Sequence, residues 1–313
     1  MTEYSDLARK LRHRNAASVA LQFPEGLKRR AREIALFLKK EGFFVIVNAD
    51  PCYGACDLAS DALPHVDALV HFGHTPVDDP GPKVIFEPYS VDVDLDVLGE
   101  AAPFLRQRTI GLVTTAQHVH LLPAMVRKLA EIGIAARTRT GSRGCREGQV
   151  LGCAFEAARI PSVDEILFVG TGLFHPLGVR LATGKRVIAL DPLAGTVQEV
   201  DEERFLRQRF ALVERARSAD SYGLIVSSKT GQGRFGLAQE MASRCRNAIL
   251  LLMREVNPEE LLNLGFPAYV NFACPRLAYD DQPRFPAPVL SPQEFQILLG
   301  ERDFSSYAID EMS

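Results

Sequence analysis

The chain has 313 residues, of which 47% are hydrophobic and 24% are charged, and its formal net charge is −3. This composition is typical of a globular protein with a sizeable core, and the slight negative charge argues against nucleic acid as a main partner. No apolar run approaches the roughly 20 residues needed to span a bilayer, and the first six residues lack the basic and apolar segments of a secretion signal. We therefore expect a cytoplasmic protein with no nucleic-acid or membrane partner.

The first hundred residues alternate between helix and strand patterns. Leu7 and Leu11 lie four positions apart and predict a helix over 1–14. Apolar runs bounded by turn residues predict the strands, and amphipathic runs predict the helices between them. The expected strands are 19–23, 43–47, 68–72 and 84–86, and the expected helices are 27–40 and 57–63.

The next stretch repeats this plan twice. The second copy has expected strands at 109–113, 134–139, 166–169 and 187–190, with a helix over 122–132. The third copy opens with a charged helix over 201–217 and continues with strands at 223–226, 248–253 and 268–272 and helices at 237–245 and 258–264. A proline-containing tail is expected to wrap over the surface and to end in a helix from Pro292.

Strands that alternate with helices indicate a mainly parallel sheet with helices on both faces. We therefore predict an α/β fold of three similar parallel-sheet α/β units, produced by internal triplication and arranged around a pseudo-three-fold axis. The expected domains are 1–100 with Cys56, 101–199 with Cys153, and 200–313 with Cys274 and the C-terminal tail. Ligands of such sheets bind beyond the carboxyl ends of the strands, so the axis would direct the three cysteine turns toward one point.

A repeated spacing selects these three cysteines from the six in the chain. Cys56 is followed after ten intervening residues by Asp67, and Cys153 is followed after the same ten residues by Asp164. Cys274 precedes the apolar segment 286–290 by a similar distance, which makes the third copy looser. Each cysteine is expected on a turn that follows a strand, a helix and a second strand.

The other three cysteines fall outside this spacing. Cys245 lies on an expected helix between two arginines and is interpreted as structural. Cys52 and Cys145 lie near enough to the expected site to affect its sensitivity to oxidation, but we predict that they are not ligands, and their roles stay open.

Three cysteine thiolates from three units suit a 4Fe–4S cluster in which one iron has no protein thiolate and can bind a substrate. One alternative is that these cysteines are ordinary buried residues that pack as small hydrophobes. A second alternative is structural zinc, which usually takes closely spaced cysteines and four ligands. Cys52-x-x-x-Cys56 offers one close pair, and the sequence contains no second such pair.

Polar turns that contain glycine follow several of the expected strands. Glycine allows backbone N–H groups to approach an anionic or polar ligand closely. Gly170-x-Gly172 alone is a weak signal, because it lacks the third glycine and the acidic residue of a dinucleotide-binding fingerprint. The turns that could bind a nucleoside or amino-acid-like ligand are 24–26, 71–74, 170–175 and 228–234.

Five motifs follow one another along the chain: Gln22-Phe-Pro-Glu-Gly-Leu27, Ala49-Asp-Pro-Cys-Tyr-Gly-Ala-Cys-Asp57, Gly148-Gln-Val-Leu-Gly-Cys153, Phe174-His-Pro-Leu-Gly178 and Ser228-Lys-Thr-Gly-Gln232. In this order they resemble the archaeal diphthamide biosynthesis enzymes of the radical S-adenosylmethionine type. The resemblance extends from about residue 17 to residue 280. It implies a homodimer of three-domain protomers in which one cysteine of each domain holds a 4Fe–4S cluster, and the family's ligands fall on Cys56, Cys153 and Cys274.

The resemblance also implies the reaction. S-Adenosylmethionine would be cleaved to methylthioadenosine and a 3-amino-3-carboxypropyl radical, which would add to a histidine of translation elongation factor 2 as the first step of diphthamide synthesis. An unidentified electron donor would reduce the cluster, and no catalytic residue beyond the cluster ligands is expected. We expect cofactor contacts from two strand-end turns, at Gly170, Thr171, Gly172, His175, Ser228, Lys229, Gln232 and Arg234.

The sequence departs from the usual radical S-adenosylmethionine motif, Cys-x-x-x-Cys-x-x-Cys, because position 59 is alanine. Ligands spread over three units would account for that departure. Two alternatives stay open at this point. The first is a dehydratase similar to quinolinate synthase, whose single cluster cysteine in each of three units would give a similar spread. The second is a non-catalytic partner of a diphthamide synthase.

Overall fold

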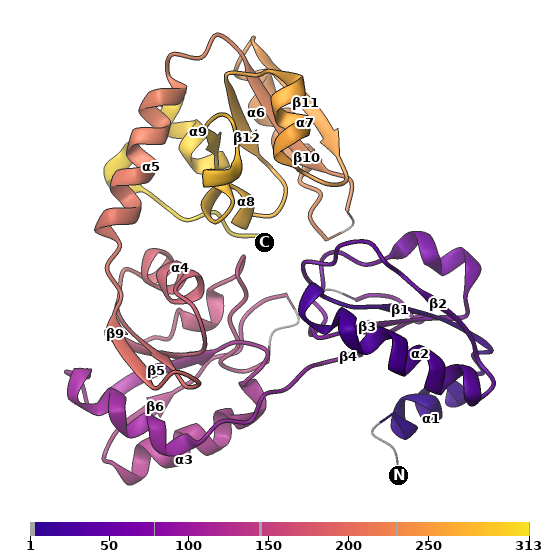
Figure 1. The fold of residues 1–313 in the computed structure, drawn as a ribbon. Helices are drawn as coiled ribbons and strands as arrows, with labels where there is room; N and C mark the ends of the chain where they lie inside the picture. Colours follow the sequence, from indigo (N-terminus) through magenta and orange to yellow (C-terminus); the bar gives the residue numbers. More distant parts are fainter. Residues whose placement is uncertain (1–3, 78, 144–145, 230, 313) are drawn as a thin grey trace. The chain divides into compact units, whose positions relative to one another are not determined.

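The computed structural model describes residues 4–77, 79–143, 146–229 and 231–312. The chain forms two compact units, 1–91 and 92–313, and each is described here by itself (Figure 1). Unit 1–91 contains one sheet, and unit 92–313 contains two. The predicted α/β class is confirmed, whereas the three-domain boundaries and the pseudo-three-fold axis stay predictions.

Unit 1–91 is a four-stranded parallel sheet with the strand order β2-β1-β3-β4. Alternate residues of β1 face opposite sides, as a pleated strand requires. Val19 and Leu21 pack against α1 and α2, whereas Ala20 packs against the segment around Ala59 and Val66. The elements are α1 (Ser5–His13), β1 (Ser18–Gln22), η1 (Glu25–Arg30), α2 (Ala31–Lys40), β2 (Phe44–Val47), η2 (Ser60–His65), β3 (Ala68–Phe72) and β4 (Val84–Glu87).

The helix predicted over 57–63 is wrong in its first half. Helical structure begins only at Ser60, with the 3₁₀ helix η2. The side-chain amide of Gln22 donates a hydrogen bond of 2.6 Å to the Asp57 carbonyl oxygen. The Gln22 side-chain oxygen in turn accepts one of 3.0 Å from the Ala59 backbone N–H. The Asp57 carbonyl oxygen and the Ala59 N–H therefore bond to a side chain of strand β1 instead of forming the backbone hydrogen bonds of an α-helix. Similarly, the predicted helix over 27–40 starts as the 3₁₀ helix η1 and becomes α-helical only from Ala31.

The first sheet of unit 92–313 has the strand order β6-β5-β7-β8-β9. Its first four strands are parallel, and β9 pairs antiparallel with β8, which the sequence patterns did not predict. The core on one face includes α3 and η3, and the core on the other includes α4 and η5 (Figure 1). The elements are η3 (Leu95–Phe104), β5 (Thr109–Thr114), η4 (Val119–Leu121), α3 (Leu122–Glu131), β6 (Ala135–Arg137), η5 (Glu156–Ala158), β7 (Glu165–Val169), α4 (Phe174–Thr183), β8 (Arg186–Asp191) and β9 (Thr196–Glu199).

The second sheet of this unit has the strand order β11-β10-β12-β13 and is parallel throughout. Helices α5, α6 and α9 contribute to the core on one face, and α7 and α8 contribute to the core on the other. The helix predicted from Pro292 is confirmed, and Ser291 and Glu294 form its capping box. The elements are α5 (Glu203–Ala216), β10 (Tyr222–Ser227), α6 (Phe235–Ser243), β11 (Ala248–Met253), α7 (Pro258–Leu264), β12 (Ala268–Asn271), α8 (Arg276–Tyr279), η6 (Gln282–Arg284), β13 (Val289–Leu290), α9 (Pro292–Leu298) and η7 (Phe304–Ser306).

The three sheets share one strand order. In each, the first strand of the chain lies between the second and the third, and the fourth pairs with the third. This common topology is consistent with internal triplication. However, the predicted common position of the cysteines is wrong for the third copy. Cys56 and Cys153 come after the second strand of their sheets, whereas Cys274 follows β12, the third strand of its sheet.

No helix among the described residues is both long and apolar enough to cross a membrane. The longest, α5, has 14 residues and is rich in charged side chains.

Candidate functional site

Cys56 lies on a tight turn between β2 and η2. The Asp57 backbone N–H donates a 3.0 Å hydrogen bond to the Gly54 carbonyl oxygen, which closes the turn around Cys56. The Asp57 carboxylate accepts a hydrogen bond from the Tyr53 backbone N–H at 3.3 Å. Asp57 is buried and Cys56 is half-buried, so the turn is fixed from inside while the thiol lies near the surface.

Cys153 lies on a loop that extends the sheet beyond the end of β5. Thr114, the last residue of β5, donates its backbone N–H to the Gly148 carbonyl oxygen at 2.8 Å and accepts from the Val150 N–H at 2.9 Å. A further bridge pairs Leu151 with Ala154 and encloses Cys153 in a turn. The half-buried Cys153 therefore lies at the carboxyl edge of its sheet, where ligands of α/β proteins bind.

Cys274 lies on the turn between β12 and α8. The Asn271 side chain accepts a 3.0 Å hydrogen bond from the Ala273 N–H and donates one of 2.8 Å to the Cys274 carbonyl oxygen. Asn271 is fully buried, whereas Cys274 is half-buried. The turn is thus fixed by a single side chain at the end of the strand.

The loops of Cys153 and Cys274 are neighbours within unit 92–313. A Cβ atom placed on Gly152 would lie 3.2 Å from Cδ of Arg276, two residues after Cys274. The Arg276 guanidinium lies over the Phe174 ring, 4.8 Å from its centroid, as in a cation–π contact. Cys56 belongs to the other compact unit, 1–91.

The C-terminal tail, 309–312, contacts the Cys153 loop directly and the Cys274 loop through Arg234. The sequence patterns did not predict these contacts. The Met312 backbone N–H donates a 2.8 Å hydrogen bond to the Cys153 carbonyl oxygen. The Asp310 carboxylate accepts two hydrogen bonds of 2.7 Å from the Arg234 guanidinium. Arg234 also donates to the Ala273 carbonyl oxygen at 3.0 Å, directly before Cys274.

Two further tail contacts complete this attachment. Glu311 accepts a hydrogen bond from the Phe155 backbone N–H at 2.9 Å and forms an ion pair with Arg159. Ile309 packs into the core of the sheet that carries Cys153. The tail therefore returns from the third sheet and binds beside the second cysteine.

The turn over 170–175 follows β7 and leads directly into α4. Thr171 and Gly172 are exposed, and Gly172 has a φ of +75°, a conformation that favours glycine. His175 lies in the first turn of α4, close to the rings of Phe168 and Phe174. Burial, and then the positive charge of Arg276, lower the pKa of His175 to about 4, so the imidazole is neutral near pH 7.

The second predicted cofactor turn, 228–234, follows β10. Ser228 is exposed, and its backbone N–H donates to the Met253 carbonyl oxygen at 2.9 Å. Lys229 and Gln232 are buried, and the Lys229 ammonium pairs with Glu255 at 2.5 Å. The structure gives Arg234 a positioning role beside Cys274, and its predicted contact with a cofactor stays a prediction.

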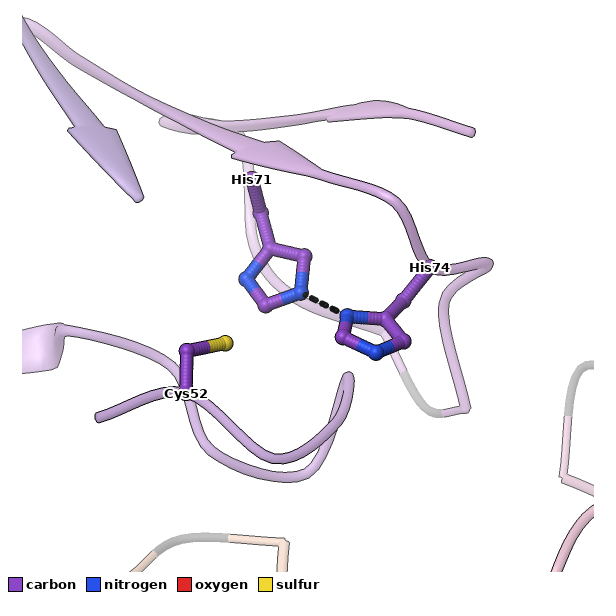
Figure 2. Close-up of side chains that lie close together, drawn as sticks. All are labelled: Cys52, His71 and His74. Atoms are coloured by element: carbon purple, nitrogen blue, oxygen red, sulfur yellow. Dashed lines mark hydrogen bonds between the residues drawn. The ribbon is translucent and has the colours of Figure 1, made fainter. Parts of the chain in front are cut away.

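The end of β3 holds a polar group that was predicted only as part of a turn. His71 is fully buried, and its Nε2 atom lies 2.9 Å from Nδ1 of the half-buried His74. Figure 2 shows both rings beside Cys52, which is also buried. Burial and then the neighbouring His74 lower the pKa of His71 to about 3. Burial lowers the pKa of His74 to about 4, although the nearby Asp57 opposes this shift.

The structure places the remaining cysteines, apart from Cys145, in different surroundings. Cys245 packs against the core of the third sheet, as predicted for a structural residue. Cys52 lies in the group with the two histidines. Cys145 lies outside the described residues, so its role stays open.

Comparisons with known proteins agree with the resemblance seen in the motifs. Residues 23–309 match the family model described as "Putative diphthamide synthesis protein". The chain is 38% identical to the 2-(3-amino-3-carboxypropyl)histidine synthase of Pyrococcus horikoshii, over 98% of this chain and 92% of that protein. It is 31% identical to subunit 1 of the Homo sapiens synthase, over 95% of this chain and 70% of that protein. The crystal structure of Dph2 from Pyrococcus horikoshii with a 4Fe-4S cluster matches with a TM-score of 0.91, covering 99% of this chain and 94% of that chain. The chain therefore belongs to the diphthamide synthesis family.

Proposed function

We propose that this protein is a 2-(3-amino-3-carboxypropyl)histidine synthase that uses a 4Fe–4S cluster and S-adenosylmethionine. The observation that carries the proposal is the placement of Cys56, Cys153 and Cys274 in a chain of this family. Each is half-buried and lies on a turn fixed by hydrogen bonds, which join backbone groups around Cys56 and Cys153 and come from the Asn271 side chain at Cys274. Three cysteine sulfurs are the donor set of a cluster with one open iron, so these residues fit the group.

Held by Cys56, Cys153 and Cys274, the cluster would supply one electron for cleavage of the bond between the sulfonium sulfur and the methionine γ-carbon. The resulting 3-amino-3-carboxypropyl radical would add to the imidazole of a histidine in translation elongation factor 2, which would then lose one proton and one electron, so that the reaction consumes no electron overall. The net products are methylthioadenosine, the modified histidine and a proton. The protein's task is to orient S-adenosylmethionine so that the γ-carbon, and not the adenosyl carbon, reacts.

Two turns of unit 92–313 are proposed to orient S-adenosylmethionine. Exposed Thr171 and Gly172 offer donors for its carboxylate, and the neutral imidazole of His175 does not repel a sulfonium cation. Around 228–234, Ser228 is exposed, whereas Lys229 is neutralised by Glu255. The proposed contacts are Gly170, Thr171, Gly172, His175, Ser228, Lys229, Gln232 and Arg234.

Further parts of this proposal concern the partners. We propose that the protein acts as a homodimer in the cytoplasm and receives electrons from a donor of unidentified type. The dehydratase alternative rested on the spread of three cysteines, which membership of the diphthamide synthesis family also explains. A non-catalytic partner of a true synthase is an outcome of the experiment below.

The test uses anaerobic, cluster-loaded protein reduced with dithionite and mixed with S-adenosylmethionine, with and without elongation factor 2. Methylthioadenosine should form, and the factor should gain one 3-amino-3-carboxypropyl group on a histidine, detected by mass spectrometry. Both signals should be lost when Cys56, Cys153 or Cys274 is changed to Ala, while Cys245→Ala retains them. Deoxyadenosine as the product would refute the cleaved bond, and no turnover from loaded protein would support the partner alternative.

A further inference from the structure

Cys52, His71 and His74 form a compact group inside unit 1–91. Their ligand atoms (one sulfur and one nitrogen from each ring) all lie within 4.8 Å of one another. Figure 2 shows Cys52 on a loop, His71 on a strand and His74 on the turn after that strand; the loop follows β2, and the strand is β3. Neither Cys56 nor the other two cysteines assigned to the cluster belong to this group.

The hydrogen bonds of Gln22 fix the protonation of His71. The Gln22 amide nitrogen donates to the Asp57 carbonyl oxygen at 2.6 Å, and its oxygen accepts from the Ala59 N–H at 3.0 Å. The same oxygen lies 2.9 Å from Nδ1 of His71, so Nδ1 must carry the proton. Nε2 of His71 is therefore the lone-pair nitrogen, and it accepts the 2.9 Å hydrogen bond from Nδ1–H of His74.

This arrangement is typical of histidines that bind metals. A metal-binding imidazole usually donates its other N–H to a carbonyl or carboxylate oxygen, which fixes the tautomer and the ring orientation. His71 makes that contact with Gln22, and Nε2 is directed toward His74. The Cys52 thiol, 4.0 Å from the Gly54 carbonyl oxygen, adds a sulfur donor that is 2% exposed.

We propose that Cys52, His71 and His74 bind one zinc-type divalent metal ion, in a site separate from that of the cluster. One thiolate and two imidazoles are ligands that zinc favours, and a fourth position stays available for water or another ligand. Bond lengths of about 2.1 Å to nitrogen and 2.3 Å to sulfur place tetrahedral donors about 3.3–3.6 Å apart. In the observed group the two ring nitrogens lie 2.9 Å apart and all three ligand atoms lie within 4.8 Å of one another, so the side chains must adjust when a metal ion binds.

Binding requires only proton movements. The Cys52 thiol releases one proton to solvent and becomes a thiolate, while His74 moves its proton from Nδ1 to Nε2. The metal ion then replaces the proton that lay between His71 and His74. No electron is transferred, and the site changes from neutral to a charge of +1, the sum of the divalent ion, one thiolate and two neutral imidazoles.

The strand register gives a second observation in favour of the site. In the first sheet, Val19–Gln22 pair with Ala68–His71, and in the third, Tyr222–Ile225 pair with Ala268–Asn271. His74 therefore takes the position in the first sheet that Cys274 takes in the third, three residues after the paired segment. The alanines at 68 and 268, the valines at 70 and 270, and the phenylalanines at 72 and 272 match as well. One turn position would thus carry a metal ligand in both sheets.

The experiment measures metal binding without the cluster. The full chain with Cys56, Cys153 and Cys274 all changed to Ser is kept anaerobic and titrated with Co²⁺ as a spectroscopic probe for zinc. One equivalent should bind, with the visible absorption of tetrahedral Co²⁺ and a near-ultraviolet thiolate charge-transfer band. Zn²⁺ should displace it.

Matched variants are made in the same background. Cys52→Ser should remove the charge-transfer band, His74→Ala should weaken Co²⁺ binding at least about tenfold, and Cys245→Ser should change neither signal. Gln22→Leu should weaken binding about 10- to 100-fold through the lost contact to His71. Circular dichroism on each variant checks the fold, and His74→Ala is the decisive variant if Gln22→Leu unfolds.

Two results would overturn the proposal. One is no tetrahedral Co²⁺ spectrum from the folded background protein. The other is a charge-transfer band that persists in Cys52→Ser or an unchanged affinity in His74→Ala. The measurement needs neither cluster nor S-adenosylmethionine, so its failure is distinguishable from a failure of the proposed transferase activity.

Discussion

Changing Asp310 to Ala should destabilise unit 92–313 and loosen the turns of Cys153 and Cys274. The Asp310 side chain is 0% exposed and accepts two hydrogen bonds of 2.7 Å from Arg234, whose side chain is 13% exposed. Gln293 donates a third hydrogen bond to the same carboxylate at 3.2 Å. Alanine removes all three and leaves the guanidinium with only backbone carbonyl acceptors.

The expected magnitude follows from burial. Removing one partner of a buried ion pair leaves an uncompensated charge and costs about 3–5 kcal/mol. For a unit of this size that corresponds to a fall in melting temperature of roughly 10 °C. The matched control is Glu203→Ala, since Glu203 pairs with Arg207 on the surface, where both side chains are more than two-thirds exposed. That change should cost at most about 0.5 kcal/mol.

The assay combines thermal unfolding with thiol labelling of cluster-free protein. Because Arg234 and Met312 hold the two cysteine turns, maleimide should label Cys153 and Cys274 faster in Asp310→Ala than in Glu203→Ala. Mass spectrometry of the digested protein assigns each labelled site. Equal melting temperatures and equal labelling rates in the two variants would refute the reasoning that the tail supports these turns.

Three further predictions concern the same unit. Gly178→Ala should destabilise the fold by about 2–3 kcal/mol, because the new Cβ would lie 2.1 Å from the buried Phe155 ring. Both changes are measured by urea titration. The control Gly236→Ala lies in helix α6 with open space around it and should be neutral or slightly stabilising. Since His175 has a folded-state pKa of about 4 against about 6.5 when unfolded, its contribution to stability should be complete above pH 6.5 and should decline from there to pH 4. His175→Asn should flatten that decline in pH-dependent melting curves, and an unchanged slope would contradict it. Arg209→Met should cost about 3–5 kcal/mol because Glu294 is left buried and unpaired, whereas adding Glu294→Leu should recover much of the loss in denaturant midpoint.

The sequence predicts the sheet strands well because their signal is local. Apolar runs such as 68–72 and 166–169 match β3 and β7 within one residue. Helix α4 was not predicted: the sequence patterns indicated only a turn over 170–175, and Pro176 and Gly178 weaken the helical signal of the residues that follow. Proline is tolerated in the first turn of a helix, and Gly178 is accommodated by its contact with Phe155. A pattern of residue types does not show that contact, because it joins residues 23 positions apart in the chain.

The candidate site also combines features that the local sequence predicts with contacts between distant residues that it does not. The three cysteines are predicted from spacing and motifs, and the structure places each of them on a turn near a strand. The groups that hold those turns come from distant parts of the chain: Gln22 bonds to Asp57 and Ala59, and Asp310 reaches Arg234. Gln22 carries a weak signal, since an amide at the end of an apolar strand is unusual. The tail carries no such signal, because its acidic residues resemble those of any exposed terminus.

The shared strand order explains how one fold can carry different chemistry at equivalent places. After the third strand of the first sheet the chain presents His74, and after the third strand of the third sheet it presents Cys274. The residue three positions earlier is fully buried and polar in both cases, His71 in one and Asn271 in the other. Asn271 bonds to its own turn and fixes the backbone that carries Cys274. His71 instead bonds to Gln22 on the neighbouring strand, and its Nε2 lone pair accepts the hydrogen bond from His74. The backbone therefore sets the position of the turn, while the buried polar residue differs: Asn271 bonds to the turn that carries Cys274, whereas His71 adds a nitrogen donor beside that of His74.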